Sequence, residues 1–237
     1  MTLNVTFMRE TFLSTLAGVP TTLELTLVAL LISFPLGFFM ALGKQSQRKL
    51  TRRCIAFYVS FIRGTPIVLQ ILFMYSLLPS LLNVIIKNVL HLPFNVFDID
   101  PILYAFIVFS LNTTAVLSEA FRSALLTVNH GQMEAALSVG LSRAQAYMRI
   151  IIPQALVAAM PNICNTTVNL LKSTSLAYMM TVKDITASAK LNAAKGYNYI
   201  EAYIVIFFIY IILCTIVQLV FQGIEKALSA YKQRVIA

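Results

Sequence analysis

The sequence predicts an all-α integral membrane protein, with five transmembrane helices and an interfacial helix at the N-terminus. Hydrophobic residues make up 59% of the chain and charged residues only 11%, whereas soluble domains are about one quarter charged. Five apolar stretches are each long enough to cross a bilayer, which takes about 20 helical residues. We therefore expect residues 1–237 to form one transmembrane domain. Its spans lie at about 22–43, 56–82, 102–126, 154–179 and 200–222.

The first apolar stretch follows twenty residues of mixed polarity. Residues 1–20 present one apolar face and predict a helix that lies in the membrane interface and ends near Pro20. Thr21 or Thr22 is then placed to cap the first span. Pro35 lies inside that span, where neighbouring helices can satisfy the carbonyl group that a proline leaves unpaired.

Charged residues inside the predicted spans need a structural or functional explanation, because placing an ionisable group within a membrane costs free energy. Arg63 lies near the inner end of the second span, where its charge can reach the interface or fix a helix end. Glu119 lies in the inner half of the third span and can pair with Arg122 one turn away or with Arg63. For Arg63 and Glu119 we expect a structural or gating role.

The segment between the third and fourth spans, residues 129–153, is predicted to form two short helices with a bend between them. Glycine takes the left-handed conformation that ends helices at no steric cost, so Gly140 is expected to end the first helix. Ser142 is expected to begin the second, because Gln145 three residues later completes a capping box. A bent helical pair held outside the bilayer is typical of a docking element.

The fourth span is unusually polar, and a run of small polar residues follows it. Broken helices at mid-depth expose backbone groups that bind polar solutes, so we expect the helix to unwind there and line a translocation path. The candidate path residues are Lys172, Ser173, Thr174, Ser175, Asn112 and Gln70. The alternative is that such side chains only join helices to one another, as is common in bundles. A loop of about twenty residues, the fifth span and a short basic tail are expected to follow.

Lysine and arginine are unevenly distributed between the two sides of the membrane. With the N-terminus outside, eleven fall on the cytoplasmic side and five outside, and the richer side is normally the cytoplasmic one. We therefore expect the N-terminus outside, and the C-terminus and residues 129–153 in the cytoplasm. The eleven are Lys44, Arg48, Lys49, Arg52, Arg53, Arg122, Arg143, Arg149, Lys226, Lys232 and Arg234; the five are Arg9, Lys87, Lys183, Lys190 and Lys195.

No residues combine into a catalytic or metal-binding set. The chain has no nucleophile with a histidine partner, no paired carboxylates and no phosphate-binding glycine loop, so we expect a transport subunit without a cofactor, not an enzyme. The three cysteines are far apart, and His91 and His130 stand alone. The net charge of +9 follows from the charge asymmetry across the membrane. Because no nucleic-acid-binding motif accompanies it, we expect no nucleic-acid partner.

The segment 129–153 resembles the EAA signature of ABC-importer permeases. The matching residues are Glu134, Ala135, Ala136, Gly140, Ile150, Ile152 and Pro153, with Ile152 where the signature usually has leucine. The resemblance implies the type I ABC importer permease fold, in which this segment forms coupling helices that seat in a groove of a cytoplasmic ATPase. It assigns the coupling role to Glu134, Ala135, Ala136 and Gly140.

Further motifs are similar to those of polar amino acid permeases. They are Arg63-Gly64-Thr65-Pro66 with Gln70, Gly131-Gln132 before Glu134, Pro153-Gln154-Ala155, and Lys172-x-Thr174-Ser175-Leu176. In permeases of this group for basic amino acids, an aspartate often follows the motif lysine. Here the residue is Ser173, which favours a substrate without a positive side chain. Residues 183–203 look most like the corresponding segment of permeases for L-cystine.

The resemblance also implies partners. These are ABC ATPase subunits that hold ATP and Mg²⁺, an extracytoplasmic amino-acid-binding protein, a second permease subunit and membrane lipid, all at the cell membrane of a prokaryote. Two alternatives stay open. The chain could be the partner in a heterodimeric permease that does not itself bind substrate. It could instead be an ion-coupled secondary amino acid carrier, although such carriers need no docking helices.

Overall fold

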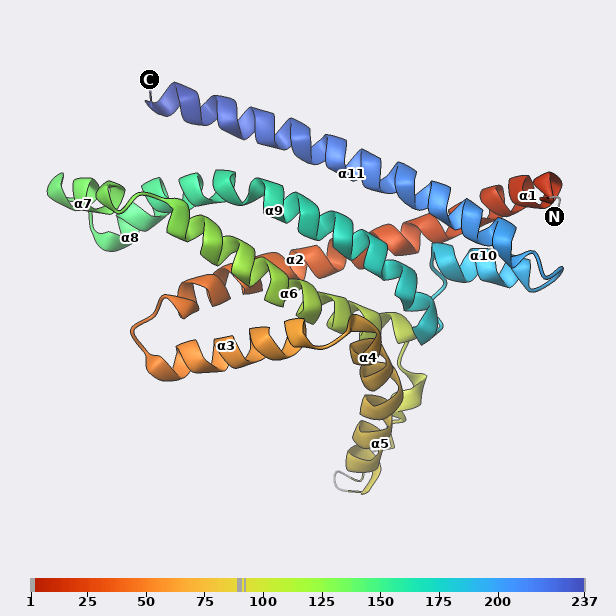
Figure 1. The fold of residues 1–237 in the computed structure, drawn as a ribbon. Coiled ribbons are helices and arrows are strands. Elements are labelled where there is room, and N and C mark those ends of the chain that lie inside the picture. The colour runs from red at the N-terminus through yellow and green to blue at the C-terminus, as the bar shows by residue number, and fades with distance from the viewer. Residues whose placement is uncertain (1–2, 89–90, 92, 237) are drawn as a thin grey trace.

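The fold is a bundle of long helices (Figure 1). The computed structural model describes residues 3–88, 91 and 93–236, in which every regular element is helical. Five helical stretches are long and apolar enough to cross a membrane, which confirms the predicted number. They are Val5–Lys44, Ile67–Asn88, Pro101–Thr127, Arg143–Met180 and Tyr199–Leu228.

The N-terminal helix and the first span form one continuous helical stretch. α1 (Val5–Thr15) passes through a single 3-10 turn into α2 (Val19–Lys44). The expected helix end near Pro20 is wrong, because a proline fits the first turn of a helix, where its missing N–H is not needed. Neither threonine caps the span. Thr22 is instead buried, and its hydroxyl accepts a hydrogen bond from the N–H of Ile185 at 3.4 Å.

The second span is not the single helix expected over residues 56–82. α3 (Lys49–Gly64) ends before Thr65, α4 (Ile67–Leu72) begins after Pro66, and the chain turns away from the bundle here (Figure 1). The cause is the proline, which disfavours helical geometry in the residue before it. Thr65 is accordingly extended, with φ −111° and ψ 138°.

In the described part of the chain, two π-helical turns interrupt the α-helical pattern, and each ends two residues before a proline. Phe73–Leu77 joins α4 to α5 (Leu78–Asn88) ahead of Pro79, and Tyr147–Ile151 precedes Pro153. A proline has no N–H to donate, and its ring clashes with the carbonyl four residues earlier. The wider turn absorbs this mismatch, so the helix continues past the proline.

α6 (Pro101–Thr127) lies at the centre of the bundle and matches the predicted third span. Asp100 caps it by accepting a hydrogen bond from the N–H of Ile102 at 2.9 Å. α6 packs most extensively against α2. Gly37 lets the two backbones approach, because a Cβ there would lie only 3.2 Å from the nitrogen of Ser118. α2 and α6 thus form the pair on which the other helices pack.

The fourth span belongs to a longer helix than predicted. α8 (Arg143–Ala146) continues through the π turn into α9 (Ile152–Ser173), and a 3-10 helix, Thr174–Met180, follows. The expected unwinding near Lys172 takes the form of this change from α- to 3-10-helical winding. The seven-residue 3-10 run is unusually long for this type of helix.

The C-terminal part is more helical than expected. α10 (Ile185–Ala193) lies within the stretch predicted as a loop, and α11 (Tyr199–Ile236) extends well beyond residue 222. The expected basic tail is therefore part of α11, which no proline interrupts after residue 222. The side chains of Lys232 and Arg234 lie outside the described residues.

Asp184 caps α10 from a fully buried position. Its Oδ1 accepts a hydrogen bond from the N–H of Ala187 at 2.8 Å, whereas Oδ2 has no partner among the described residues. Gly18 packs directly on it: a Cβ on Gly18 would lie 2.5 Å from the carbonyl carbon of Asp184. Burial raises the pKa of Asp184 from its ordinary value of 3.8 to about 6.

Replacing Asp184 by asparagine is expected to stabilise the protein at neutral pH. A carboxyl group whose pKa is raised by folding stabilises the fold only while protonated, so its contribution falls as the pH rises from about 4 to about 6. About two pKa units correspond to roughly 3 kcal/mol. Asparagine caps helices equally well and stays neutral. The apparent Tm in detergent should be higher for D184N than for wild type at pH 7.5, and the gap should shrink at pH 4.5. A variant less stable than wild type at pH 7.5 contradicts this account.

Candidate functional site

A polar network closes the break between α3 and α4. The side-chain nitrogen of Gln70 lies 2.8 Å from the carbonyl oxygen of Ile62, 3.1 Å from that of Thr65 and 2.8 Å from Thr65 Oγ1. The Thr65 hydroxyl in turn donates to the carbonyl oxygen of Phe61 at 3.0 Å. Side chains thus satisfy the carbonyl groups that a helix end leaves unpaired, which is required where water is excluded.

The same network connects Gln70 to Asn112 in α6. Because the Gln70 nitrogen faces carbonyl oxygens, its Oε1 faces the other way and accepts a hydrogen bond from Nδ2 of Asn112 at 3.2 Å. One donor of the Asn112 amide is used in this bond, and its Oδ1 stays an acceptor. Two of the predicted path residues are therefore in direct contact.

Asn112 also lines a cavity of about 100 Å³ between α4, α6 and α9. The wall combines polar and apolar side chains and contains no charged one. The lining residues are Ile67, Asn112, Thr113, Val116, Thr166, Asn169, Leu170 and Ser173. The structure thus brings together Asn112 and Ser173, which are predicted path residues from different spans.

The other predicted path residues lie outside this wall. Thr174 is buried, and its hydroxyl donates to the carbonyl oxygen of Leu171 at 2.6 Å. Lys172 is exposed and Ser175 half-buried. Gln70 lies beside the cavity through its bond to Asn112 and does not line it.

Sequence reasoning missed Thr166 and Asn169 as cavity residues. The polarity of the fourth span is evident, but polarity alone does not say which face of the helix matters. Thr166, Asn169 and Ser173 follow one another at intervals of three and four residues, which places them on one face. That spacing was the available signal. Thr113 lies next to Asn112 and carried no signal of its own.

The 3-10 helix after Ser173 ends in a strained residue. Thr181 has φ 60°, a conformation that β-branched residues rarely adopt. Its hydroxyl lies 3.0 Å from that of Tyr75, in the π turn that joins α4 to α5. Extended 3-10 stretches often mark hinges. The cavity therefore adjoins an extended 3-10 segment that ends in a left-handed residue.

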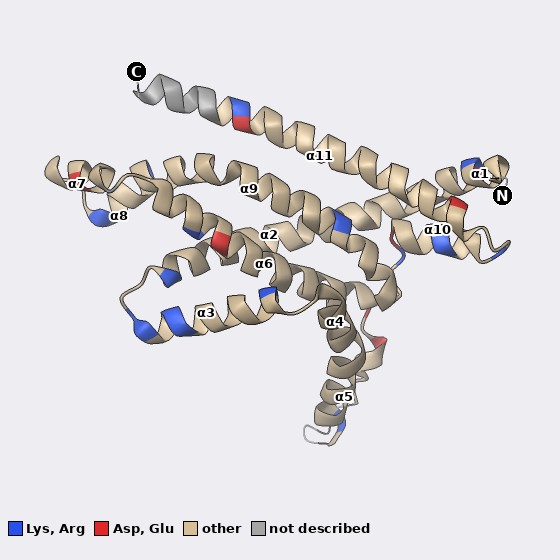
Figure 2. Ribbon diagram, in the orientation of Figure 1, with Lys and Arg blue, Asp and Glu red and all other residues tan. Residues whose placement is uncertain are grey.

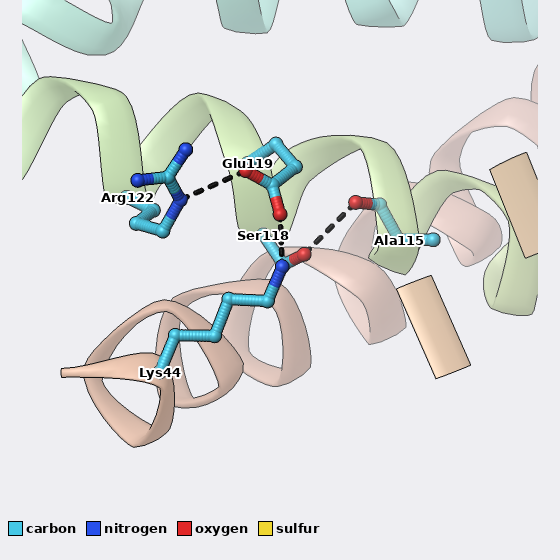
Figure 3. Close-up of polar contacts among 5 residues, drawn as sticks. All are labelled: Lys44, Ala115, Ser118, Glu119 and Arg122. Carbon is cyan, nitrogen blue, oxygen red and sulfur yellow. Dashed lines mark hydrogen bonds and ion pairs between the residues drawn. The ribbon is translucent and has the colours of Figure 1, made fainter. Parts of the chain in front are cut away.

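Three charged side chains join α2 to α6 (Figure 3). One carboxylate oxygen of Glu119 accepts a hydrogen bond from Nε of Arg122 at 2.8 Å, and the other pairs with Nζ of Lys44. The predicted pairing with Arg122 is confirmed. Lys44 was not indicated, because no local pattern links residues so far apart in the chain. Arg63 is exposed and forms no ion pair within the described part of the chain.

The segment between α6 and α9 is a bent helical pair, as predicted. α7 (His130–Ser138) ends before Gly140, which has φ 84°. The N–H of Leu141 bonds to the carbonyl oxygen of Ala136 at 3.1 Å, and the N–H of Gly140 to that of Leu137 at 3.0 Å. These two bonds form a Schellman cap, so the bend is fixed by the backbone itself.

The second helix of the pair, α8, begins with the predicted capping box. Ser142 Oγ accepts a hydrogen bond from the N–H of Gln145 at 3.3 Å, and Gln145 Oε1 accepts one from the N–H of Ser142 at 2.8 Å. Gln154 at the start of α9 donates to Gln132 of α7 at 3.4 Å. The pair is therefore connected to the fourth span both by the chain and by side chains.

One face of the bent pair is open. Glu134 and Ala135 are exposed, whereas Ala136 is only 2% exposed and packs inward. Consecutive helical residues point in different directions, so Ala136 supports the pair from inside, and its part in coupling stays a prediction. Val139 is 77% exposed and Met148 69%.

Basic side chains gather at the end of the bundle that carries the bent pair (Figure 2). They lie in the turn between α2 and α3 and in the bent pair itself. This is the arrangement expected for a cytoplasmic end. Among the described residues, no group of three or more His, Cys, Asp and Glu is close enough to hold a metal ion. The His130 side chain lies outside those residues.

Comparison with known proteins gives a family match over most of the chain. Residues 33–230 match the family described as "Binding-protein-dependent transport system inner membrane component". The "Probable amino-acid permease protein YxeN" of Bacillus subtilis is 33% identical over 96% of this chain and 97% of its own length. The "L-cystine transport system permease protein TcyL" of the same species is 32% identical over 93% of this chain and 89% of its own length.

Solved structures share the fold. A crystal structure of an amino acid ABC transporter with histidines matches with a TM-score of 0.80 and 28% identity, over 96% of this chain and 100% of that chain. The MetNI methionine ABC transporter, in an inward-facing conformation, matches with a TM-score of 0.69 over 90% of this chain and 95% of that chain. Its identity is 17%, so this likeness concerns the fold alone.

Proposed function

Because this chain belongs to the family of binding-protein-dependent transport system inner membrane components and is the permease subunit of an amino acid ABC importer, we propose that it imports L-cystine and related polar amino acids. It forms the path together with a second permease subunit in a prokaryotic cell membrane. The N-terminus lies outside the cell and the C-terminus in the cytoplasm. ATP and Mg²⁺ are held by partner ATPase subunits, and an extracytoplasmic binding protein delivers the amino acid.

The observation that carries the proposed coupling to an ATPase is the bent pair α7–α8. It is capped at both ends of its bend, exposes Glu134, Ala135 and apolar side chains, and continues without a break into the span that lines the polar cavity. A chain with no nucleotide-binding motif needs such an element to receive energy from elsewhere. Movement of the docked pair is passed directly to α9, and so to Ser173.

The residue at position 173 supports a substrate without net side-chain charge. Ser173 occupies the position where the resemblance places aspartate in permeases for basic amino acids. The similarity to an L-cystine permease points the same way. We therefore place L-cystine ahead of arginine, lysine and histidine.

Uptake of labelled L-cystine should depend on this chain and should be inhibited by unlabelled L-cystine but not by basic amino acids. The measurement compares cells with and without the chain, using a panel of unlabelled competitors in excess. A strain that carries the Glu134→Lys variant controls for uptake through other systems. Inhibition by arginine or lysine, without inhibition by cystine, would overturn the substrate assignment and leave the transport role intact.

A further inference from the structure

Two hydroxyl groups in the cavity wall already donate hydrogen bonds to backbone carbonyl oxygens of α9. Thr166 Oγ1 donates to the carbonyl oxygen of Asn162 at 2.7 Å, and Ser173 Oγ donates to that of Asn169 at 2.8 Å, each one turn earlier in α9. A hydroxyl group has one donor and two acceptor positions. Thr166 and Ser173, which both line the cavity, therefore have only acceptor positions left for a molecule inside it.

Asn112 presents the same polarity through a chain of directed hydrogen bonds. The carbonyl oxygen of Ile62 accepts a hydrogen bond from the side-chain nitrogen of Gln70. The Oε1 of Gln70 in turn accepts one from Nδ2 of Asn112. Neither amide can be reversed without placing an oxygen against an oxygen. The broken end of α3 thus sets the orientation of Asn112 and leaves Oδ1 as an acceptor.

We infer that this cavity, on the path of the proposed function, holds the α-ammonium group of the transported amino acid. An ammonium group has three donors and no acceptor, and Asn112, Thr166 and Ser173 supply three acceptors. Hydrogen bonds from a charged donor are about twice as strong as neutral ones, so uncharged oxygens are sufficient. A path must also release its substrate, and a wall without carboxylates favours release.

The cavity has room for an ammonium group. Its volume of about 100 Å³ is well above the roughly 15 Å³ of accessible space that a group the size of a water molecule needs. Asn169, which lines the same wall and is exposed, carries two amide donors that can meet the neighbouring carboxylate. The cavity recognises what all amino acids share.

The sign of the recognised charge is tested with Ser173→Asp and Ser173→Lys. The complete assembly of permease, ATPase and binding protein is reconstituted in liposomes, and labelled cystine taken up is divided by ATP hydrolysed. A site for an ammonium group tolerates a new carboxylate and repels a new cation, so the aspartate variant should exceed the lysine variant at least tenfold. Equal ratios, or the reverse order, overturn the inference.

The acceptor role is tested with a matched pair of variants in α9. Thr166→Val removes an acceptor from the cavity. Thr167→Val removes the same kind of intrahelical bond, to the carbonyl oxygen of Ile163 at 2.9 Å, from a residue that does not line the cavity. Cystine taken up per ATP hydrolysed should be about tenfold lower in the Thr166→Val variant than in the Thr167→Val variant. Equal losses would assign Thr166 to helix stability alone.

If the proposed function is wrong, the results differ from those expected if only the ammonium site is wrong. If the wild-type assembly hydrolyses ATP but takes up another amino acid instead of cystine, the substrate assignment fails. The ranking of the variants is then measured with that amino acid, because every amino acid carries the same ammonium group. If the wild-type assembly transports no amino acid while its ATPase responds to the loaded binding protein, both proposals are overturned.

Discussion

Replacing Glu134 by lysine is expected to abolish amino acid uptake while leaving the protein in the membrane. Glu134 is exposed on α7, the first helix of the bent pair that the proposed function docks on an ATPase. If α7 docks on an ATPase as proposed, the carboxylate becomes buried in the interface, and a reversed charge there would lack a partner. Leaving a buried charge unpaired costs about 3–5 kcal/mol, which corresponds to a loss of at least about 100-fold. Labelled uptake and co-purification with the ATPase measure the effect.

The matched control for this variant is Glu10→Lys. Glu10 is also exposed, but it lies in α1 at the opposite end of the bundle (Figure 1). The change in charge is identical, so membrane insertion and net charge are controlled together. Co-purification with the ATPase should persist for Glu10→Lys and be lost for Glu134→Lys. If the Glu134 variant retains both uptake and the ATPase, the coupling role of α7 is wrong.

Replacing Gln70 by methionine is expected to destabilise the subunit strongly, although the shape of the side chain is nearly preserved. The change removes the nitrogen that donates to the carbonyl groups of Ile62 and Thr65, and leaves only a 3.4 Å contact from the Thr65 hydroxyl to the carbonyl oxygen of Ile62. Each unsatisfied buried polar group costs about 1–3 kcal/mol. For a chain of this size the apparent Tm should fall by roughly 10 °C. Thermal unfolding of the purified subunit in detergent measures the shift.

Asn112→Leu provides the graded comparison. It removes only the outer bond of the network, at 3.2 Å, and leaves the helix end satisfied by Gln70. Its Tm should therefore fall by less than half as much. Uptake should nevertheless be lost in both variants, because the inferred ammonium site needs Asn112 as an acceptor and Gln70 to orient it. A Tm for Gln70→Met equal to that of wild type would show that the network does not stabilise the break.

Hydropathy predicted the number of spans and the third span closely, because an apolar stretch of about 20 residues has few alternatives in a bilayer. It failed for the second span. Average hydropathy does not register that Pro66 forces Thr65 out of the helix, nor that Gln70 can satisfy the freed carbonyl groups. The motif that includes these three residues was visible in the sequence. Its structural meaning was not.

Local motifs were predictable where the interacting atoms are a few residues apart. The left-handed Gly140 and the capping box of Ser142 and Gln145 belong to this class. The pairing of Lys44 with Glu119 was not predictable in this way, since it depends on how α2 packs on α6. The same holds for the cavity, where Thr166 acquires a role only through its position opposite α6. Tertiary packing decides such contacts, and one sequence carries no direct record of it.

The continuity of the helical stretch from Arg143 to Met180 gives it the mechanics of a lever. At about 1.5 Å per residue, thirty residues separate Arg143 from Ser173 by about 45 Å. A tilt of about 5° around one end then displaces the other by about 4 Å, more than the length of a hydrogen bond. Small rotations imposed on α8 by a docked partner would therefore be large enough to change the distance between Ser173 and Asn112 across the cavity.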